Sequence, residues 1–154
     1  MKNKTEKPYY KKSNSIKEFE DLYFAYEIKN KYSNIPYPVK SSFRDNANGL
    51  TRYIVKWLEM HQYFAGRVNT TGIYSQKLKK YIYSGSKRGM ADITAVINGR
   101  HVSIEVKIGK DKMRSAQMEV KKEIEQAGGV YIVTSSFDNF LEQIEAVKEN
   151  INTH

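Results

Sequence analysis

Two short segments joined by Asn98-Gly99 constrain the fold more than any other part of this sequence. Residues 92–97 (DITAVI) and 100–107 (RHVSIEVK) largely alternate between apolar and polar side chains, as strands with two different faces do. An Asn-Gly pair is the strongest short-range signal for a two-residue type I′ turn, because both turn positions need a positive φ. The stretch therefore predicts a β-hairpin in which Ile97 pairs with Arg100.

This register brings three charged side chains together. Asp92 lies directly opposite Glu105, and strand alternation puts Lys107 on the same face as Glu105. Opposed carboxylates repel each other, but a divalent cation between them reverses the sign of the interaction, and their oxygens suit Mg²⁺ or Mn²⁺. Lys107 can hold an anionic phosphoryl oxygen or a water that loses its proton. The hairpin thus predicts a site for phosphodiester hydrolysis. The alternative is that Asp92 lies in a loop and that Glu105 and Lys107 line a solvated face.

The remaining chain predicts helices and strands in alternation. Residues 70–90 mix Gly, Ser, Lys and Tyr without a clear period, which indicates a loop or an irregular hairpin. Ser15 can cap the first helix. The pattern is typical of a mixed α/β domain with helices on a small sheet. The expected elements are helices at 16–31, about 48–61, 115–127 and 137–151, and strands at 63–69 and 130–134 in addition to the hairpin.

Charge and composition narrow the function. The 154 residues carry a net charge of +9, and residues 46–90 hold 8 Lys or Arg against 1 acidic residue. Such a region indicates either a polyanionic partner or a device for solubility. The absence of cysteine excludes disulfides, a cysteine nucleophile and a thiolate zinc site. No apolar run approaches the roughly 18 residues of a membrane span, and no apolar segment follows the basic N-terminus. We therefore expect a cytoplasmic protein that is neither secreted nor associated with a membrane.

The sequence resembles the PD-(D/E)XK nuclease superfamily, in which an acidic residue is followed on the next strand by [DE]-x-K. Here Asp92 is followed, after twelve residues, by Glu105-Val106-Lys107. Within the superfamily it looks most like the VRR-NUC branch, which is related to Holliday-junction-resolvase-like enzymes. Residues 89–92 (GMAD) match the Gly-x-Pro-Asp turn of that branch, with Ala in the proline position, and residues 115–117 (SAQ) match its helix-starting Gln. The resemblance covers about residues 46–137.

The resemblance implies a restriction-endonuclease-like core with the order αβββαβ, in which a small mixed sheet is flanked by helices. We expect a basic flexible tail (1–15), an N-terminal helical extension (16–45) and a nuclease domain (46–154). By resemblance, Asp92, Glu105 and the Val106 carbonyl would bind Mg²⁺ or Mn²⁺. Lys107 would position the attacking water or stabilise the transition state, and Gln117 would support the site. A homodimer is a further arrangement that the resemblance implies.

The prediction is a metal-dependent DNA endonuclease, structure-selective or nonspecific, acting in replication, recombination or repair. Relatives often carry a Glu on the first core helix, whereas residues 47–50 (ANGL) have none, although Asn48 could contribute. This departure keeps open a non-catalytic nucleic-acid-binding module on the same fold. An RNA- or ribosome-associated basic protein also stays open, while a restriction enzyme lacks room for a large recognition domain. The predicted nucleic-acid contacts are Arg67, Lys77, Lys79, Lys80, Lys87, Arg88, Lys110, Lys112 and Arg114.

Overall fold

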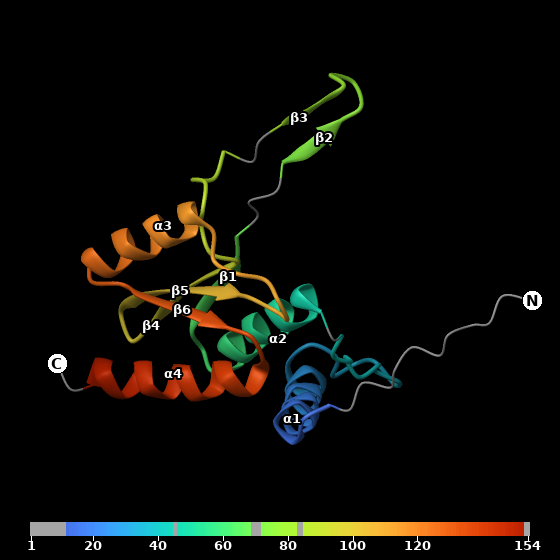
Figure 1. The fold of residues 1–154 in the computed structure, drawn as a ribbon. Coiled ribbons are helices and arrows are strands. Elements are labelled where there is room, and N and C mark those ends of the chain that lie inside the picture. Colours follow the sequence, from blue (N-terminus) through green and yellow to red (C-terminus); the bar gives the residue numbers. More distant parts are fainter. Residues whose placement is uncertain (1–11, 45, 69–71, 83–84, 153–154) are drawn as a thin grey trace, which may run out of the picture.

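Within the described part of the chain, the protein combines a four-stranded sheet, a separate two-stranded hairpin and four helices (Figure 1). The computed structural model describes residues 12–44, 46–68, 72–82 and 85–152. The mixed α/β class expected from the sequence is confirmed. The elements are α1 (Asn14–Asn30), α2 (Ala47–Met60), β1 (Phe64–Arg67), β2 (Ile73–Ser75), β3 (Lys80–Ile82), β4 (Ile93–Ile97), β5 (Arg100–Val106), α3 (Ser115–Gln126), β6 (Val130–Thr134) and α4 (Phe137–Asn152).

The main sheet has the strand order β1-β4-β5-β6, with β1, β4 and β5 antiparallel and β6 parallel to β5. The predicted hairpin register is confirmed, because Ile97 pairs with Arg100. Asn98 and Gly99 have φ values of 49° and 80°, as a type I′ turn requires. Parallel pairing of β5 with β6 needs a crossover connection, and α3 supplies it.

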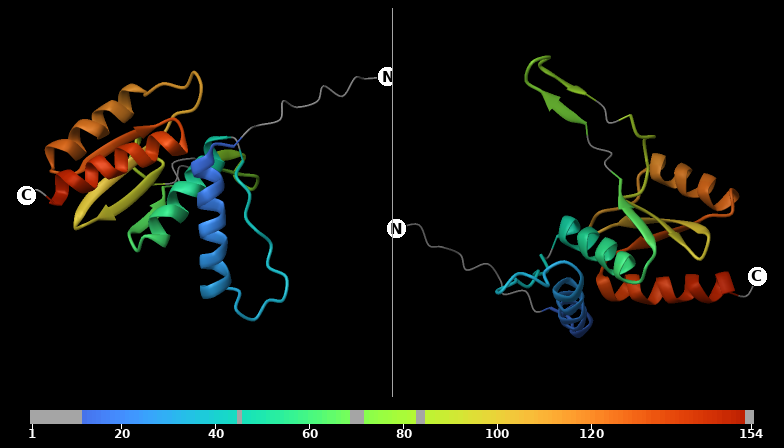
Figure 2. Two further views of the ribbon diagram at one scale, coloured as in Figure 1. Left: turned by 90° about the horizontal axis from the view of Figure 1, so that it is seen from below. Right: turned by 180° about the vertical axis from the view of Figure 1, so that it is seen from behind.

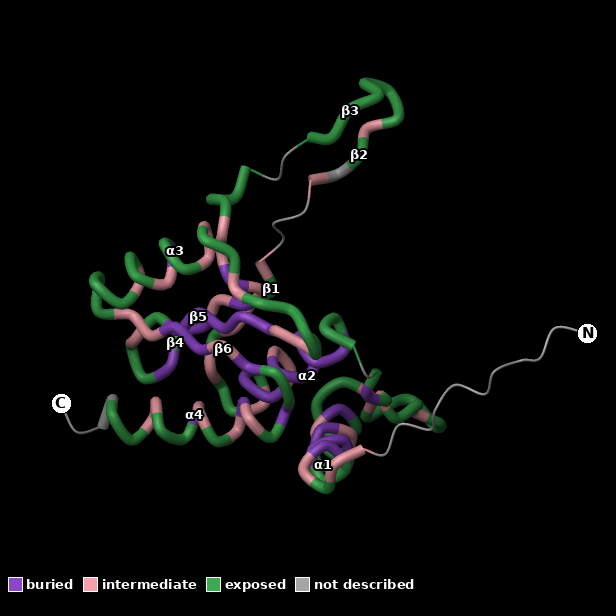
Figure 3. Tube along the Cα trace, viewed as in Figure 1, coloured by how far each residue is buried: buried purple, intermediate pink, exposed green. Residues whose placement is uncertain are grey.

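Helices cover both faces of this sheet. α2 and α4 pack on one face and α3 packs on the other, as the views in Figures 1 and 2 show. The larger core includes Leu58 of α2, Ile104 of β5 and Phe140 of α4. A smaller cluster under α3 contains Ala91, Val120 and Tyr131. β5 is therefore buried on both faces along most of its length (Figure 3), so the alternative of a solvated polar face is wrong.

The N-terminal helix packs against α2 and α4 and contributes side chains to the larger core. Its cap differs from the prediction: the Ser13 hydroxyl accepts from the Ile16 amide, whereas Ser15 lies inside α1 and donates to Asp138 of α4. Among the described residues, the basic segment expected at 1–15 is represented only by its last few positions. Lys12, the first of them, forms a 2.8 Å ion pair with Glu20.

For the segment between β1 and β4, the sequence left open a loop or an irregular hairpin, and the structure shows a hairpin. β2 and β3 pair antiparallel, with Tyr74 opposite Tyr81. Figure 1 shows that this hairpin extends away from the main sheet. Residues 70–71 and 83–84 of the predicted segment lie outside the described residues, as does residue 69, the last of the strand predicted at 63–69. None of the helices in the described ranges has the length and apolarity needed to cross a membrane.

Candidate active site

Asp92 lies immediately before β4, between β1 and β5. Its main-chain carbonyl accepts from the Val68 amide at 2.8 Å, and its carboxylate oxygen Oδ2 accepts from the Val106 amide at 2.9 Å. Both bonds connect Asp92 to neighbouring strands, so its carboxylate is held at the end of the sheet where β5 ends. Asp92 itself lies in a bend just outside β4, as the alternative had it, and the strand register begins only with Ile93 and Ile104. These two bonds nevertheless keep its carboxylate beside the end of β5.

A glycine turn fixes how Asp92 approaches α3. Gly89 has φ +86°, and a Cβ at this position would lie 2.3 Å from the Ala116 carbonyl oxygen. Only glycine adopts this conformation at this separation without strain. The turn therefore lets the chain before Asp92 pass directly beside the first turn of α3, where Gln117 lies.

Glu105, Lys107 and Gln117 form one hydrogen-bonded group. Lys107 Nζ lies 3.0 Å from Glu105 Oε1, and the Gln117 amide donates to the same oxygen. The other end of the Gln117 side chain accepts from the Arg114 amide at 3.0 Å, which caps the N-terminus of α3. Gln117 thus fixes both the start of the helix and one oxygen of Glu105. Three of the four residues predicted to be catalytic are brought together here, and Asp92 joins them through β5.

The electrostatics of Glu105 are unusual for a carboxylate. Only 3% of the Glu105 surface is exposed to solvent. Burial raises its pKa above the ordinary value; Lys107 counteracts part of this rise, and the Asp92 carboxylate adds to it. In the described part of the chain, Glu105 Oε2 is buried without a hydrogen-bond partner. A buried acceptor of this kind costs stability unless a donor or a cation satisfies it.

Lys107 remains a cation in this setting. Burial alone would lower its pKa, but the Glu105 carboxylate and the Asp111 carboxylate outweigh burial and raise that pKa. Asp111 Oδ2 lies 3.3 Å from Lys107 Nζ. The Lys107 side chain is 11% exposed, so its ammonium keeps limited access to solvent beside Glu105. The pairing of Asp111 with Lys107 is a contact that sequence reasoning missed.

The donor set at this position suits an oxygen-loving divalent cation. Two carboxylates, one with an unsatisfied buried oxygen, provide anionic ligands of the kind that Mg²⁺ and Mn²⁺ take together with several waters. The described residues contain no group of three or more His, Cys, Asp or Glu residues that could enclose a metal. Val106 is buried in the larger core, and its amide holds Asp92. Its carbonyl as a ligand stays a prediction.

Asn48, considered as a substitute for the missing helix glutamate, is engaged elsewhere. The Arg67 guanidinium donates to Asn48 Oδ1 across α2 and β1. This pairing orients Arg67, a predicted nucleic-acid contact, at the N-terminus of α2. The acidic residue of α2, Glu59, lies in the last turn of the helix and not at this end.

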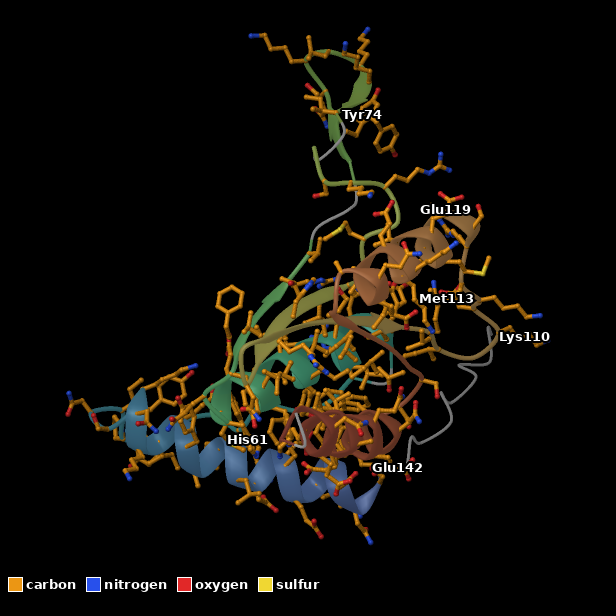
Figure 4. The ribbon with its side chains drawn as sticks, turned by 90° about the vertical axis from the view of Figure 1, so that its left-hand side faces the viewer. His61, Tyr74, Lys110, Met113, Glu119 and Glu142 are labelled. Carbon is orange, nitrogen blue, oxygen red and sulfur yellow. The ribbon has the colours of Figure 1, made fainter. Side chains whose placement is uncertain are left out.

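The structure divides the remaining predicted nucleic-acid contacts between three places. Lys87 forms an ion pair with Glu123 of α3, and Arg88 is exposed beside it. The loop that connects Lys107 to α3 carries a second set, of which Lys110 points outward from the protein in Figure 4. All of these side chains are exposed. The second set is Lys110, Lys112 and Arg114, and the third, on the β2–β3 hairpin, is Lys77, Lys79 and Lys80.

Tyr131 is a site residue that sequence reasoning missed. It lies in β6 opposite Ser103, and its hydroxyl is buried without a hydrogen-bond partner among the described residues. Burial raises the pKa of Tyr131, and the Glu105 and Asp92 carboxylates raise it further. The sequence carries no local signal for this position, because only parallel pairing of β5 with β6 brings it near the carboxylates.

Comparisons of the sequence with protein-family models and with curated proteins give no match. The functional interpretation therefore depends on the geometry of the site itself.

Proposed function

We propose that this protein is a Mg²⁺-dependent DNA endonuclease of the PD-(D/E)XK class. The observation that carries the proposal is the buried Glu105 carboxylate, which is held through one oxygen by Lys107 and Gln117 while its other oxygen has no partner in the described part of the chain. A purely structural carboxylate would be satisfied or exposed. A carboxylate kept in this state beside Asp92 is equipped to bind a cation.

The order of the elements also supports the proposal. α2, β1, β4, β5, α3 and β6 follow one another along the chain as αβββαβ, with the β2–β3 hairpin inserted between β1 and β4. This is the order that the resemblance to restriction-endonuclease-like cores implies. Asp92 precedes the second of these core strands and Glu105 lies near the end of the third, as the PD-(D/E)XK motif requires.

The residues of the site would divide the work as follows. Asp92 and Glu105 hold the cation, and Gln117 keeps the Glu105 carboxylate in one orientation through its bond to Oε1. Lys107 keeps a positive charge beside the carboxylates, where it stabilises negative charge on the scissile phosphate. A Mg²⁺ ion bound there would lower the pKa of the attacking water and neutralise charge on the phosphate.

Cleavage assays test this proposal directly. Labelled duplex, single-stranded, flap and four-way-junction DNA are incubated with Mg²⁺, Mn²⁺ or EDTA. We expect metal-dependent cleavage that is lost in Asp92→Ala and in Lys107→Ala. Asp111→Asn serves as the matched control, because it removes a carboxylate that contacts Lys107 from an exposed position outside the proposed ligand set. Cleavage that persists in EDTA or in the two site variants would refute the proposal.

A second candidate is a nucleic-acid-binding module on this fold that does not cut. The absence of a third acidic ligand among the described residues favours it, since relatives often carry a glutamate at the position where α2 begins. This candidate predicts DNA binding that is sensitive to salt and unaffected by EDTA, together with no cleavage of any substrate in the assay above.

A further inference from the structure

The β2–β3 hairpin lies apart from the cores that stabilise the protein. It extends away from the main sheet, both in Figure 1 and in the view from behind in Figure 2. Among the described residues, no side chain of either core cluster comes from residues 72–82. An isolated two-stranded hairpin is marginally stable in water. Its exposed side chains are therefore better explained by a binding partner than by packing within this chain.

The charge of the hairpin indicates a polyanionic partner. Between Glu59 and Asp92 the sequence contains six Lys or Arg residues and no acidic residue. Three of these cations, Lys77, Lys79 and Lys80, are exposed on the hairpin and form no ion pair with a described carboxylate. Lysines in this state neutralise phosphates and release counterions when a nucleic acid binds.

The aromatic residues of the hairpin indicate which form of nucleic acid binds. Tyr74 and Tyr81 are cross-strand partners whose rings pack edge to face, with centroids 5.2 Å apart. The two residues are 50% and 66% exposed. Figure 4 shows Tyr74 on the hairpin, away from the body of the protein. Exposed aromatic faces stack on unpaired bases, whereas a base inside a duplex presents only its edges.

We propose that the β2–β3 hairpin is an arm that binds DNA containing unpaired bases. Its three lysines, Lys77, Lys79 and Lys80, contact phosphates, and the Tyr74–Tyr81 pair stacks on an unpaired base. The inference rests on the proposed function for the identity of the ligand as DNA, and it adds the structural class of the substrate. The position of the arm in the fold suits this role, because β1 ends at Arg67, opposite Ile93, and the hairpin thus follows the strand that lies beside Asp92.

Binding titrations in EDTA test the phosphate contacts. Fluorescence anisotropy is measured with a labelled single strand and with a duplex of the same sequence, over a fourfold range of salt. The triple variant Lys77→Gln/Lys79→Gln/Lys80→Gln should lose about 2 units of the salt slope for single strands, at about 0.7 per phosphate contact. Over the fourfold salt range, the fold-loss of affinity in the triple variant should therefore be about 18 times smaller than the fold-loss in the wild type. The control variant carries the same change of charge at exposed positions elsewhere: Lys17→Gln/Lys29→Gln/Lys122→Gln.

Tyrosine variants test the choice of unpaired bases. Tyr74→Ala/Tyr81→Ala should weaken binding of the single strand by about fivefold or more, which corresponds to the stacking of one base, and should change duplex binding less than twofold. Tyr74→Phe/Tyr81→Phe keeps both rings and should bind the single strand like the wild type. The conservative variant therefore separates a loss of stacking from a loss of the hairpin.

Three results would overturn this inference. One is a salt slope in the arm triple variant that equals that of the control triple variant. Another is a fall in duplex affinity as large as the fall for the single strand in the Ala variant. The third is a wild-type dimer that becomes a monomer in the Ala variant during sedimentation, since this would show a second copy on the tyrosine face. Arm-dependent binding without Mg²⁺-dependent cleavage would support the arm and refute the nuclease; cleavage with normal binding by the arm variants would do the reverse.

Discussion

The hydroxyl of Tyr131 allows a quantitative test of the site. It is buried and lacks a partner among the described residues, while its ring packs in the small cluster with Ala91 and Val120. Tyr131→Phe removes the unsatisfied hydroxyl and leaves the ring in place. Removing such a group recovers about 1–3 kcal/mol, and the small void left behind costs about 0.2 kcal/mol at roughly 24 cal/mol per Å³. We expect the free energy of unfolding to rise by about 1–3 kcal/mol.

Urea denaturation in EDTA near neutral pH measures this change. In thermal melting, the melting temperature should rise by about 2–12 °C, given about 2–4 °C for each kcal/mol in a chain of this length. Tyr53→Phe is the matched control: it deletes the same atom, but the Tyr53 hydroxyl donates to Glu20 Oε1 at 3.0 Å. That variant should lose about 1.5–3 kcal/mol, because the lost hydrogen bond is to a carboxylate. A loss of stability in Tyr131→Phe comparable with that of Tyr53→Phe would show that the Tyr131 hydroxyl has a partner, and would refute the reasoning.

Three further predictions concern the proposed metal site, the glycine turn before Asp92 and the buried Glu20 carboxylate of α1. Mg²⁺ at about 100 times its dissociation constant should add about 2.7 kcal/mol to wild-type stability and nothing to Asp92→Asn, as measured by thermal melting. Gly89→Ala should cost about 2 kcal/mol or more in urea denaturation because of its contact with the Ala116 carbonyl, whereas Gly85→Ala, with φ +73° and open space, should cost only about 1 kcal/mol. Burial alone would raise the pKa of Glu20, but three hydrogen-bond donors outweigh it and lower that pKa. The ionised Glu20 carboxylate therefore contributes its full stabilisation above the pKa of the unfolded chain, near 4.5, and this contribution is lost as the pH falls through the lower pKa of the folded protein. The difference in the free energy of unfolding between the wild type and Glu20→Gln should accordingly shrink on acidification.

The register of the central hairpin could be predicted from the sequence because it depends on local chemistry. A two-residue Asn98-Gly99 turn allows only one register of the two strands, and this register brings Asp92 to the end of β5, where Glu105 lies. The bounds of α2, α3 and α4 also follow closely from the periodicity of their apolar side chains, and those of β6 from its short apolar run after Gly129. The predicted N-cap of α1 was wrong because either of two serines, Ser13 and Ser15, could cap the helix. The contact that engages Ser15 instead, with Asp138 of α4, is nonlocal.

The burial of the polar face of β5 is the feature that local reasoning could not supply. Alternation shows which side chains share a face, but the solvent exposure of that face depends on whether α3 lies over it. Gly89 permits the close approach of the preceding turn to α3, and Gln117 anchors the start of the helix to Glu105. These contacts turn Glu105 into a buried, partly unsatisfied charge. The same contacts lower the stability of the protein without a ligand. The buried Glu105 oxygen has no donor in the described chain, so only a bound cation or solvent can satisfy it. Stability in the presence and absence of Mg²⁺ therefore reports on the site independently of cleavage, and it separates a metal centre from a polar cluster that merely fills the space under α3.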